Sequence, residues 1–141
     1  MQEKKVMLGS AEWIELGGEI LTDIVKEYGE DGFALSVCEV FVEAPAEIAD
    51  EQGNASWCFY VDGKSVRSSP GASKEVDLYM QATWELELPG ARQVYTPEWL
   101  AEQETNPTPR PEDPNMVIEG DMNRLPAWIM EFHNRLAVRT A

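Results

Sequence analysis

The sequence predicts an α+β fold, because its helix-like and strand-like patterns occupy separate parts of the chain. Apolar residues recur at helical spacing near both ends, in residues 11–29 and 121–137. Between them lie segments of β-branched and aromatic residues, of which the clearest is a hairpin around residues 56–68. A chain of 141 residues is long enough to bury one core. We therefore expect a single domain over residues 1–141.

The first element is predicted to be a helix over residues 11–29, capped by Ser10 and ended by Gly29. The pair Gly17-Gly18 weakens a helix, so either close packing or a break is expected there. One apolar stripe of this helix is predicted to comprise Trp13, Leu16, Ile20, Ile24 and Tyr28.

Strands are predicted to follow. In residues 33–43 the apolar phase shifts between Ser36 and Glu39, a pattern that permits a β-bulge. Residues 45–54 read as a loop that has room for a short helical turn, and Asp62-Gly63 as the turn of a hairpin. Residues 74–82 alternate with Val76, Leu78, Met80 and Ala82 on one face, which predicts a strand with one buried face.

Helices and an exposed segment are predicted next. Thr83 is expected to cap a helix that reaches Tyr95 and is interrupted at Pro89-Gly90. Thr96-Pro97-Glu98 then opens a second short helix. Residues 102–115 hold four prolines and are polar, so we expect an exposed Pro-rich loop within the domain.

The last unit is predicted to be a strand over residues 116–119, a turn at Gly120-Asp121 and a helix that Pro126 splits near its start. His133 falls at the edge of the apolar stripe of that helix, while Met130 and Asn134 fall opposite. The stripe itself comprises Leu125, Trp128, Ile129, Phe132 and Leu136.

Charge and composition argue against several functional classes. With 26 acidic and 11 basic residues the net charge is -15, which disfavours nucleic acid and anionic lipid surfaces; the excess acid is interpreted as a source of solubility. No apolar run approaches the ~18 residues of a membrane span, and none resembles a signal peptide. We therefore expect a cytoplasmic protein that is not an integral membrane protein. Cys38 and Cys58 are expected to be free, buried thiols, and two Cys with one His cannot form a zinc site.

No catalytic residue is predicted. Nucleophile elbows, phosphate loops and HExxH motifs are absent from the sequence. His133 is the single imidazole, and Glu131, two residues before it, would point elsewhere on a helix. We interpret His133 as a boundary residue that hydrogen-bonds to the backbone or to water.

Three segments together resemble the sterol carrier protein type 2 family. They are WCFYVDGKSVRSSPGASKEVDLYMQA at residues 57–82, the helix opening at Thr83-Trp84, and MVIEGDMNRLPAWIMEFHNRLA at residues 116–137. The similarity covers roughly residues 11–138. It implies one mixed five-stranded sheet covered on one face by helices, with an apolar tunnel between them for a fatty acyl chain or a sterol-like ligand, and no cofactor.

The resemblance and the two apolar faces lead to one prediction of the site. The lining is expected to comprise Leu78, Met80, Trp84, Leu88, Trp128 and Phe132, with His133 at the rim near the polar end of a ligand. The predicted function is that of an intracellular carrier, which binds an apolar, lipid-like ligand and could present this ligand to a partner enzyme. Two alternatives stay open: an enzyme or accessory subunit that uses His133 or a buried acid in the same cavity, and an interaction subunit or homodimer whose tunnel is filled by side chains.

Overall fold

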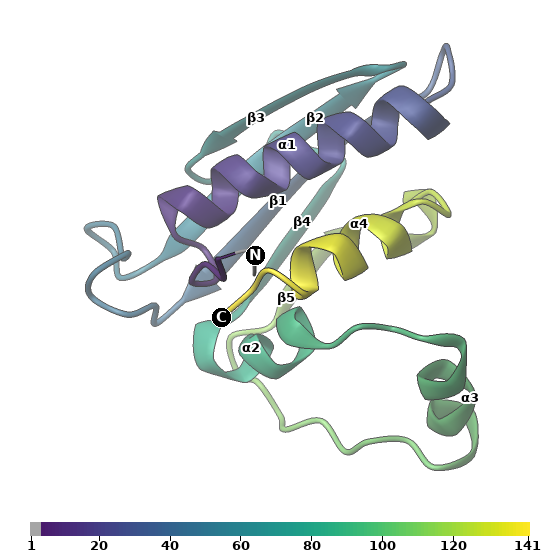
Figure 1. The fold of residues 1–141 in the computed structure, drawn as a ribbon. Helices are drawn as coiled ribbons and strands as arrows, with labels where there is room; N and C mark the ends of the chain where they lie inside the picture. The colour runs from purple at the N-terminus through teal and green to yellow at the C-terminus, as the bar shows by residue number, and fades with distance from the viewer. Residues whose placement is uncertain (1–3) are drawn as a thin grey trace.

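In a computed structural model that describes residues 4–141, the chain forms one mixed five-stranded sheet with the strand order β3-β2-β1-β4-β5 (Figure 1). The parallel pair is β1 with β4, and the other neighbours are antiparallel. The predicted α+β class with a single mixed five-stranded sheet is confirmed. The strands are β1 Ala34–Val42, β2 Ala55–Asp62, β3 Ser65–Pro70, β4 Leu78–Thr83 and β5 Val117–Gly120.

Helices α1 and α4 lie side by side over one face of this sheet, and α2 lies at the end of β4 (Figure 1). Within the described residues, no helix is both long and apolar enough to span a membrane. The helices are α1 Ala11–Tyr28, α2 Trp84–Arg92, α3 Pro97–Thr105, the short 3-10 helix η1 Met122–Arg124 and α4 Ile129–Ala137.

Helix α1 begins and ends where the sequence predicts. The Ser10 hydroxyl accepts a hydrogen bond from the Trp13 amide at 3.1 Å, and the chain leaves the helix at Gly29. The glycine pair permits close packing rather than a break: a Cβ at Gly17 would lie 3.1 Å from the Trp57 ring, and one at Gly18 2.6 Å from Ser68 Oγ.

The apolar stripe of α1 was predicted at the wrong angle. Leu16 and Ile20 are only partly buried, and Tyr28 is 44% exposed. A stripe centred one position further along the helix packs on the sheet instead, because the two glycines let the backbone approach β2 and β3. Its buried members are Trp13, Ile14, Gly17, Leu21, Ile24 and Val25.

Strand β1 has no bulge, so that prediction is wrong. It pairs without interruption with β2 from Ala34 to Phe41 and with β4 from Val37 to Val42. The apolar phase shifts in the sequence because both faces of this central strand are buried: one carries Leu35, Val37, Glu39 and Phe41, and the other carries Cys38 and Val40.

The hairpin of β2 and β3 is confirmed, with Asp62 paired to Ser65 and Gly63 at φ 60° in the turn. Residues 45–49 form the predicted short turn, in which the Ile48 and Ala49 amides donate to Pro45 O. Strand β4 is shorter than predicted, and it has two covered faces, since Tyr79 is buried on the side opposite Leu78.

Helix α2 continues through Pro89-Gly90 to Arg92, which corrects the predicted interruption and the predicted end at Tyr95. The Thr83 side chain does not cap it; its hydroxyl and amide both donate to the Asp113 carboxylate at 2.7 Å. Helix α3 is capped as predicted by Thr96, and it extends to Thr105. The exposed Pro-rich segment therefore begins at residue 106.

The final unit forms the predicted strand and a divided helix. Asp121 caps η1, and Pro126 separates η1 from α4. Phe132 and Leu136 are buried, and the remaining stripe residues Leu125, Trp128 and Ile129 are partly buried against the same core. After α4 the chain returns to its beginning, where Thr140 forms a parallel bridge with Val6.

Candidate ligand-binding cavity

A cavity of about 490 Å³ lies between the helix-covered face of the sheet and helices α2 and α4. Its floor comes from the sheet, through Val37, Glu39 and Phe41 of β1, Phe59 of β2 and Met80 of β4. Its opposite wall comes from α4, through Ile129, Phe132, His133 and Leu136. Gly90 and Ala91 of α2 close one side, and the exposed side chains Met122, Met130 and Arg110 form the rim.

Aromatic rings support the inner end of this cavity. Trp57 is fully buried, and its ring centroid lies 5.4 Å from that of Trp13 and 5.0 Å from that of Phe59. Phe132 of α4 lies 6.0 Å from Phe59 in a tilted arrangement. Such contacts fix the rings in place, so the helices are held apart from the sheet by large rigid side chains.

Glu39 is the one acid on the helix-facing row of β1, in the middle of the sheet. In the register of the sheet it pairs with Trp57 of β2 and with Met80 of β4. Its Oε1 accepts a hydrogen bond of 2.9 Å from the Trp57 indole N–H. Burial raises the pKa of Glu39 to about 7; the Trp57 hydrogen bond acts in the opposite direction, and Glu87 adds a smaller rise.

A second acid, Glu87 of α2, lines the same cavity nearer to the rim. Burial raises its pKa, while Arg110 lowers it from a distance of 3.7 Å between Arg110 Nη2 and Glu87 Oε1. The Arg110 side chain is mostly exposed, so this ion pair contributes little stability. It nevertheless places the cation at the entrance and leaves Glu39 at the inner end.

His133 lies at the rim of the cavity and holds the segment that follows α2. Its Nε2 lies 2.8 Å from Gln93 O, and because a carbonyl accepts, this nitrogen carries the proton. Its ring stacks on Tyr95 with centroids 4.3 Å apart, and Asn134 binds both the Tyr95 amide and carbonyl. Burial lowers the pKa of His133, which favours the neutral ring. These contacts match the interpretation of His133 as a boundary residue bonded to backbone.

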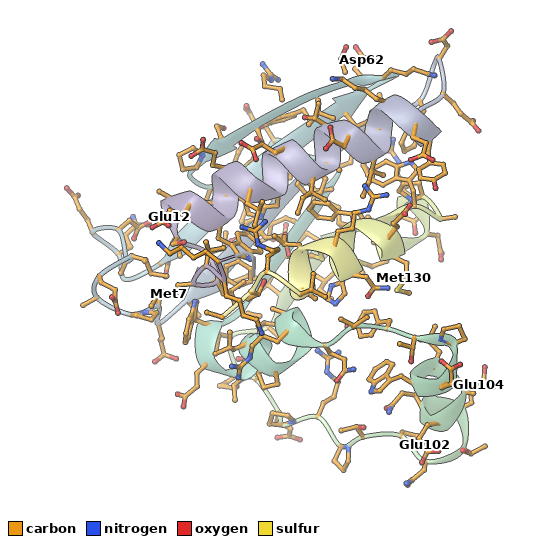
Figure 2. The ribbon with its side chains drawn as sticks, viewed as in Figure 1. Met7, Glu12, Asp62, Glu102, Glu104 and Met130 are labelled. Carbon is orange, nitrogen blue, oxygen red and sulfur yellow. The ribbon has the colours of Figure 1, made fainter. Side chains whose placement is uncertain are left out.

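Helix α3 projects from the body beyond this rim. None of its residues is buried, and Figure 2 shows Glu102 and Glu104 on α3, away from the sheet, and Met130 on α4. Stacked rings connect α3 to α4. The Trp99 ring of α3 stacks on Tyr95 with centroids 4.8 Å apart, and Tyr95 in turn stacks on His133 of α4.

The structure brings together three of the seven side chains predicted to line a ligand site. Met80, Phe132 and His133 line the cavity. Leu78 is fully buried in the core, and Leu88 packs against that core. Trp84 also packs there and donates from its indole N–H to Leu8 O at 2.8 Å. Trp128 borders a separate surface pocket, beside Tyr28 and Phe33.

Sequence reasoning missed the polar lining. Glu39, Glu87 and Arg110 were not predicted to line the site, although Glu39 gave a signal: it is a charged residue in the middle of a mostly apolar strand, FALSVCEVFVE. Cys38 and Cys58 are buried free thiols, as predicted, on the opposite face of the sheet. Among residues 4–141, no group of three or more His, Cys, Asp or Glu side chains could hold a metal ion.

Comparisons with known proteins give a likeness in structure alone. No protein-family model and no curated protein matches the chain. The solution structure of a conserved hypothetical protein from Thermus thermophilus, described as possibly a sterol carrier protein, aligns over 99% of this chain and 94% of that chain. The TM-score is 0.48 and the sequence identity is 13%, a similarity that does not establish a shared function.

Proposed function

We propose that this protein binds an apolar, lipid-like small molecule in the cavity between the sheet and helices α2 and α4. The observation that carries the proposal is the cavity itself, whose volume of about 490 Å³ suits a small ligand. Its walls are mainly aromatic and aliphatic, so an apolar ligand gains about 25 cal/mol for each Å² removed from water. Binding of this kind needs no cofactor.

The composition of the rim supports entry of a flexible ligand. Met80, Met122 and Met130 line the cavity, and the last two are exposed. Methionine side chains adapt their shape to different apolar surfaces at little cost. The protein would thus act as a carrier that protects its ligand from water and delivers it to a partner enzyme.

The proposal is tested by comparing the ligand affinity of a protein whose cavity is open with that of a variant whose cavity is partly filled by a side chain. Gly90 lines the cavity, and a Cβ built there meets no atom within 4 Å, so Gly90→Leu should fold with part of the space filled. Gly90→Ala is the matched control, because it makes the same backbone change in α2 and leaves the space open.

Native mass spectrometry of protein purified from cells, followed by titration with 1-decanol, should show a bound apolar molecule. We expect Gly90→Leu to weaken binding about tenfold or more, as one lost hydrophobic contact of this size would do. No binding by the unaltered protein, or equal binding by Gly90→Leu and Gly90→Ala, would contradict the proposal.

A second candidate is an enzyme that moves a proton on an apolar substrate. The observation that favours it is Glu39, because an acid with a pKa of about 7 in an apolar cavity is suited to general acid–base catalysis. His133 Nε2 is engaged by Gln93 O, so Glu39 is the better candidate for the base. Turnover of a bound ligand that is abolished by Glu39→Gln, while its binding persists, would support this candidate.

The interaction-subunit alternative makes a different prediction. It requires a self-association surface, and size-exclusion chromatography with light scattering measures that directly. A monomer that binds ligand would favour the carrier.

A further inference from the structure

Glu39 is placed to recognise the polar end of a ligand. It lies on β1, the central strand, and points to the same face as Phe41 and Val37, which also line the cavity. Its neighbours across the sheet are Trp57 and Met80. Glu39 therefore lies in a cavity whose other lining side chains are mostly apolar, with the exposed Met122 and Met130 at its rim.

The hydrogen-bonding capacity of this carboxyl is only partly used. Trp57 Nε1 donates to Oε1, and no other hydrogen bond or ion pair to Glu39 is found within residues 4–141. A carboxylate accepts about four hydrogen bonds through its two oxygens. Every fully buried side-chain oxygen of the described residues has a partner, so Oε2 retains accessible surface, and Glu39 borders the cavity.

The charges around the cavity select among head groups. The titratable groups that line it are Glu39, Glu87, Tyr95, Arg110 and His133. Arg110 pairs with Glu87 at the rim, and His133 is held neutral by burial and donates to Gln93 O. The inner end thus presents an acceptor with no cation beside it. A ligand carboxylate there would face a like charge, whereas an O–H or N–H donor would gain a hydrogen bond.

We propose that the cavity takes an apolar molecule whose polar end is a hydrogen-bond donor, a hydroxyl or a protonated amine, and that this end binds Glu39. Carboxylate-headed lipids are rejected at the same position. This inference rests on the proposed function, since it specifies the ligand of that cavity.

The test uses four ligands with the same chain length and different heads: decylamine, 1-decanol, methyl decanoate and decanoate. Isothermal titration calorimetry should rank the affinities with both donors above the ester and with decanoate weakest. Between pH 6 and pH 8 Glu39 loses its proton, so affinity for decylamine should rise severalfold while affinity for the ester stays constant.

The variant Glu39→Gln separates charge from shape. We expect it to weaken decylamine binding about tenfold or more and to remove its pH dependence, since a charge-assisted hydrogen bond is lost. Binding of 1-decanol should change less, because the amide oxygen still accepts. Glu15→Gln, on the exposed side of α1, makes the same carboxyl-to-amide replacement and should alter none of these affinities.

Each result decides between the two proposals. If none of the four ligands binds, the proposed function fails. If all four bind equally, if decanoate binds most tightly, or if Glu39→Gln weakens all four alike, the head-group inference is overturned and the carrier proposal stands. The pH comparison uses the unaltered protein, so it remains decisive even where a variant folds poorly.

Discussion

The two faces of the sheet are covered in different ways. On the outer face, Cys38, Val40, Cys58 and Tyr79 form a small cluster that the chain itself closes between β3 and β4. The Ser73 amide contacts Cys38 Sγ at 3.4 Å, and Cys58 Sγ contacts Gly71 O at 3.4 Å. On the other face, helices from both ends of the chain rest on large aromatic side chains, and the cavity lies among them.

This difference shows how a small domain can keep a cavity and still have a core. On the outer face, cysteine, valine and tyrosine side chains pack closely, and the segment between β3 and β4 contacts them directly. Helices are rigid cylinders, and Trp13, Trp57 and Phe132 hold α1 and α4 at a distance that side chains fill only in part. Glu39, the inward acid of β1, lies on the hollow side, where it can face a ligand.

The largest expected effect tests whether the helix-covered face is hollow beside Met80. Leu78 and Met80 lie on the same face of β4, but Leu78 is fully buried and Met80 lines the cavity. Leu78→Ala should cost about 2–5 kcal/mol of unfolding free energy, as in a packed core. Met80→Ala should cost roughly 1 kcal/mol, since its surroundings are already partly empty. Equal losses in denaturant titrations would mean that both sites are packed alike.

A somewhat smaller effect concerns the pH dependence of the unfolding free energy that results from burying Glu39 on the helix-covered face. Because its folded pKa of about 7 exceeds its unfolded value, the folded state binds the proton more tightly. Stability from this group is therefore greatest at low pH and falls as the pH rises from about 4.5 to 7, by roughly 3 kcal/mol. The difference in unfolding free energy between Glu39→Gln and the unaltered protein should grow in favour of the variant by this amount between pH 5 and pH 8.

Glu15→Gln serves as the control for that measurement, since it removes an exposed acid and should leave the pH dependence unchanged. A constant difference between Glu39→Gln and the unaltered protein across this pH range would show that Glu39 is well solvated.

The smallest expected effect concerns the rim of the cavity. His133→Ala removes the hydrogen bond to Gln93 and the stack on Tyr95, which should cost about 1 kcal/mol. The segment from Gln93 to the Pro-rich loop should then be cleaved faster in limited proteolysis. The glutamine of His133→Gln can still donate to Gln93 O, so this variant should regain part of the protection from cleavage. Identical cleavage of the unaltered protein and both variants would show that His133 does not hold this segment.

The parts of the fold that the sequence predicted have strong local signals. Ser10 and Thr96 form side-chain caps, and the turn at Gly63 joins the hairpin as expected. The parallel pairing of β1 with β4 was not predicted: the family resemblance implied only a mixed sheet, and no local pattern encodes which strands become neighbours.

The candidate site was less accessible to sequence reasoning. Alternation of apolar and polar residues shows which face of a strand is buried only where the other face is polar. Both faces of β1 are buried, so its sequence pattern did not show that Glu39 points to the helices. Arg110 lies in a polar loop, where a charged residue carries no signal, and it reaches the cavity through the path of the chain after α3.

The bridge between Val6 and Thr140 has a consequence for how the protein is made. Trp13 Nε1 donates to Thr140 Oγ1 at 3.2 Å, and the Val6 and Ala141 amides complete the junction with Arg139 O and Val6 O. During synthesis, β1 to β4 leave the ribosome before α4 does, so the part of their aromatic face that α4 covers stays exposed until α4 has emerged. For that interval the nascent chain exposes part of the apolar surface that later encloses the cavity.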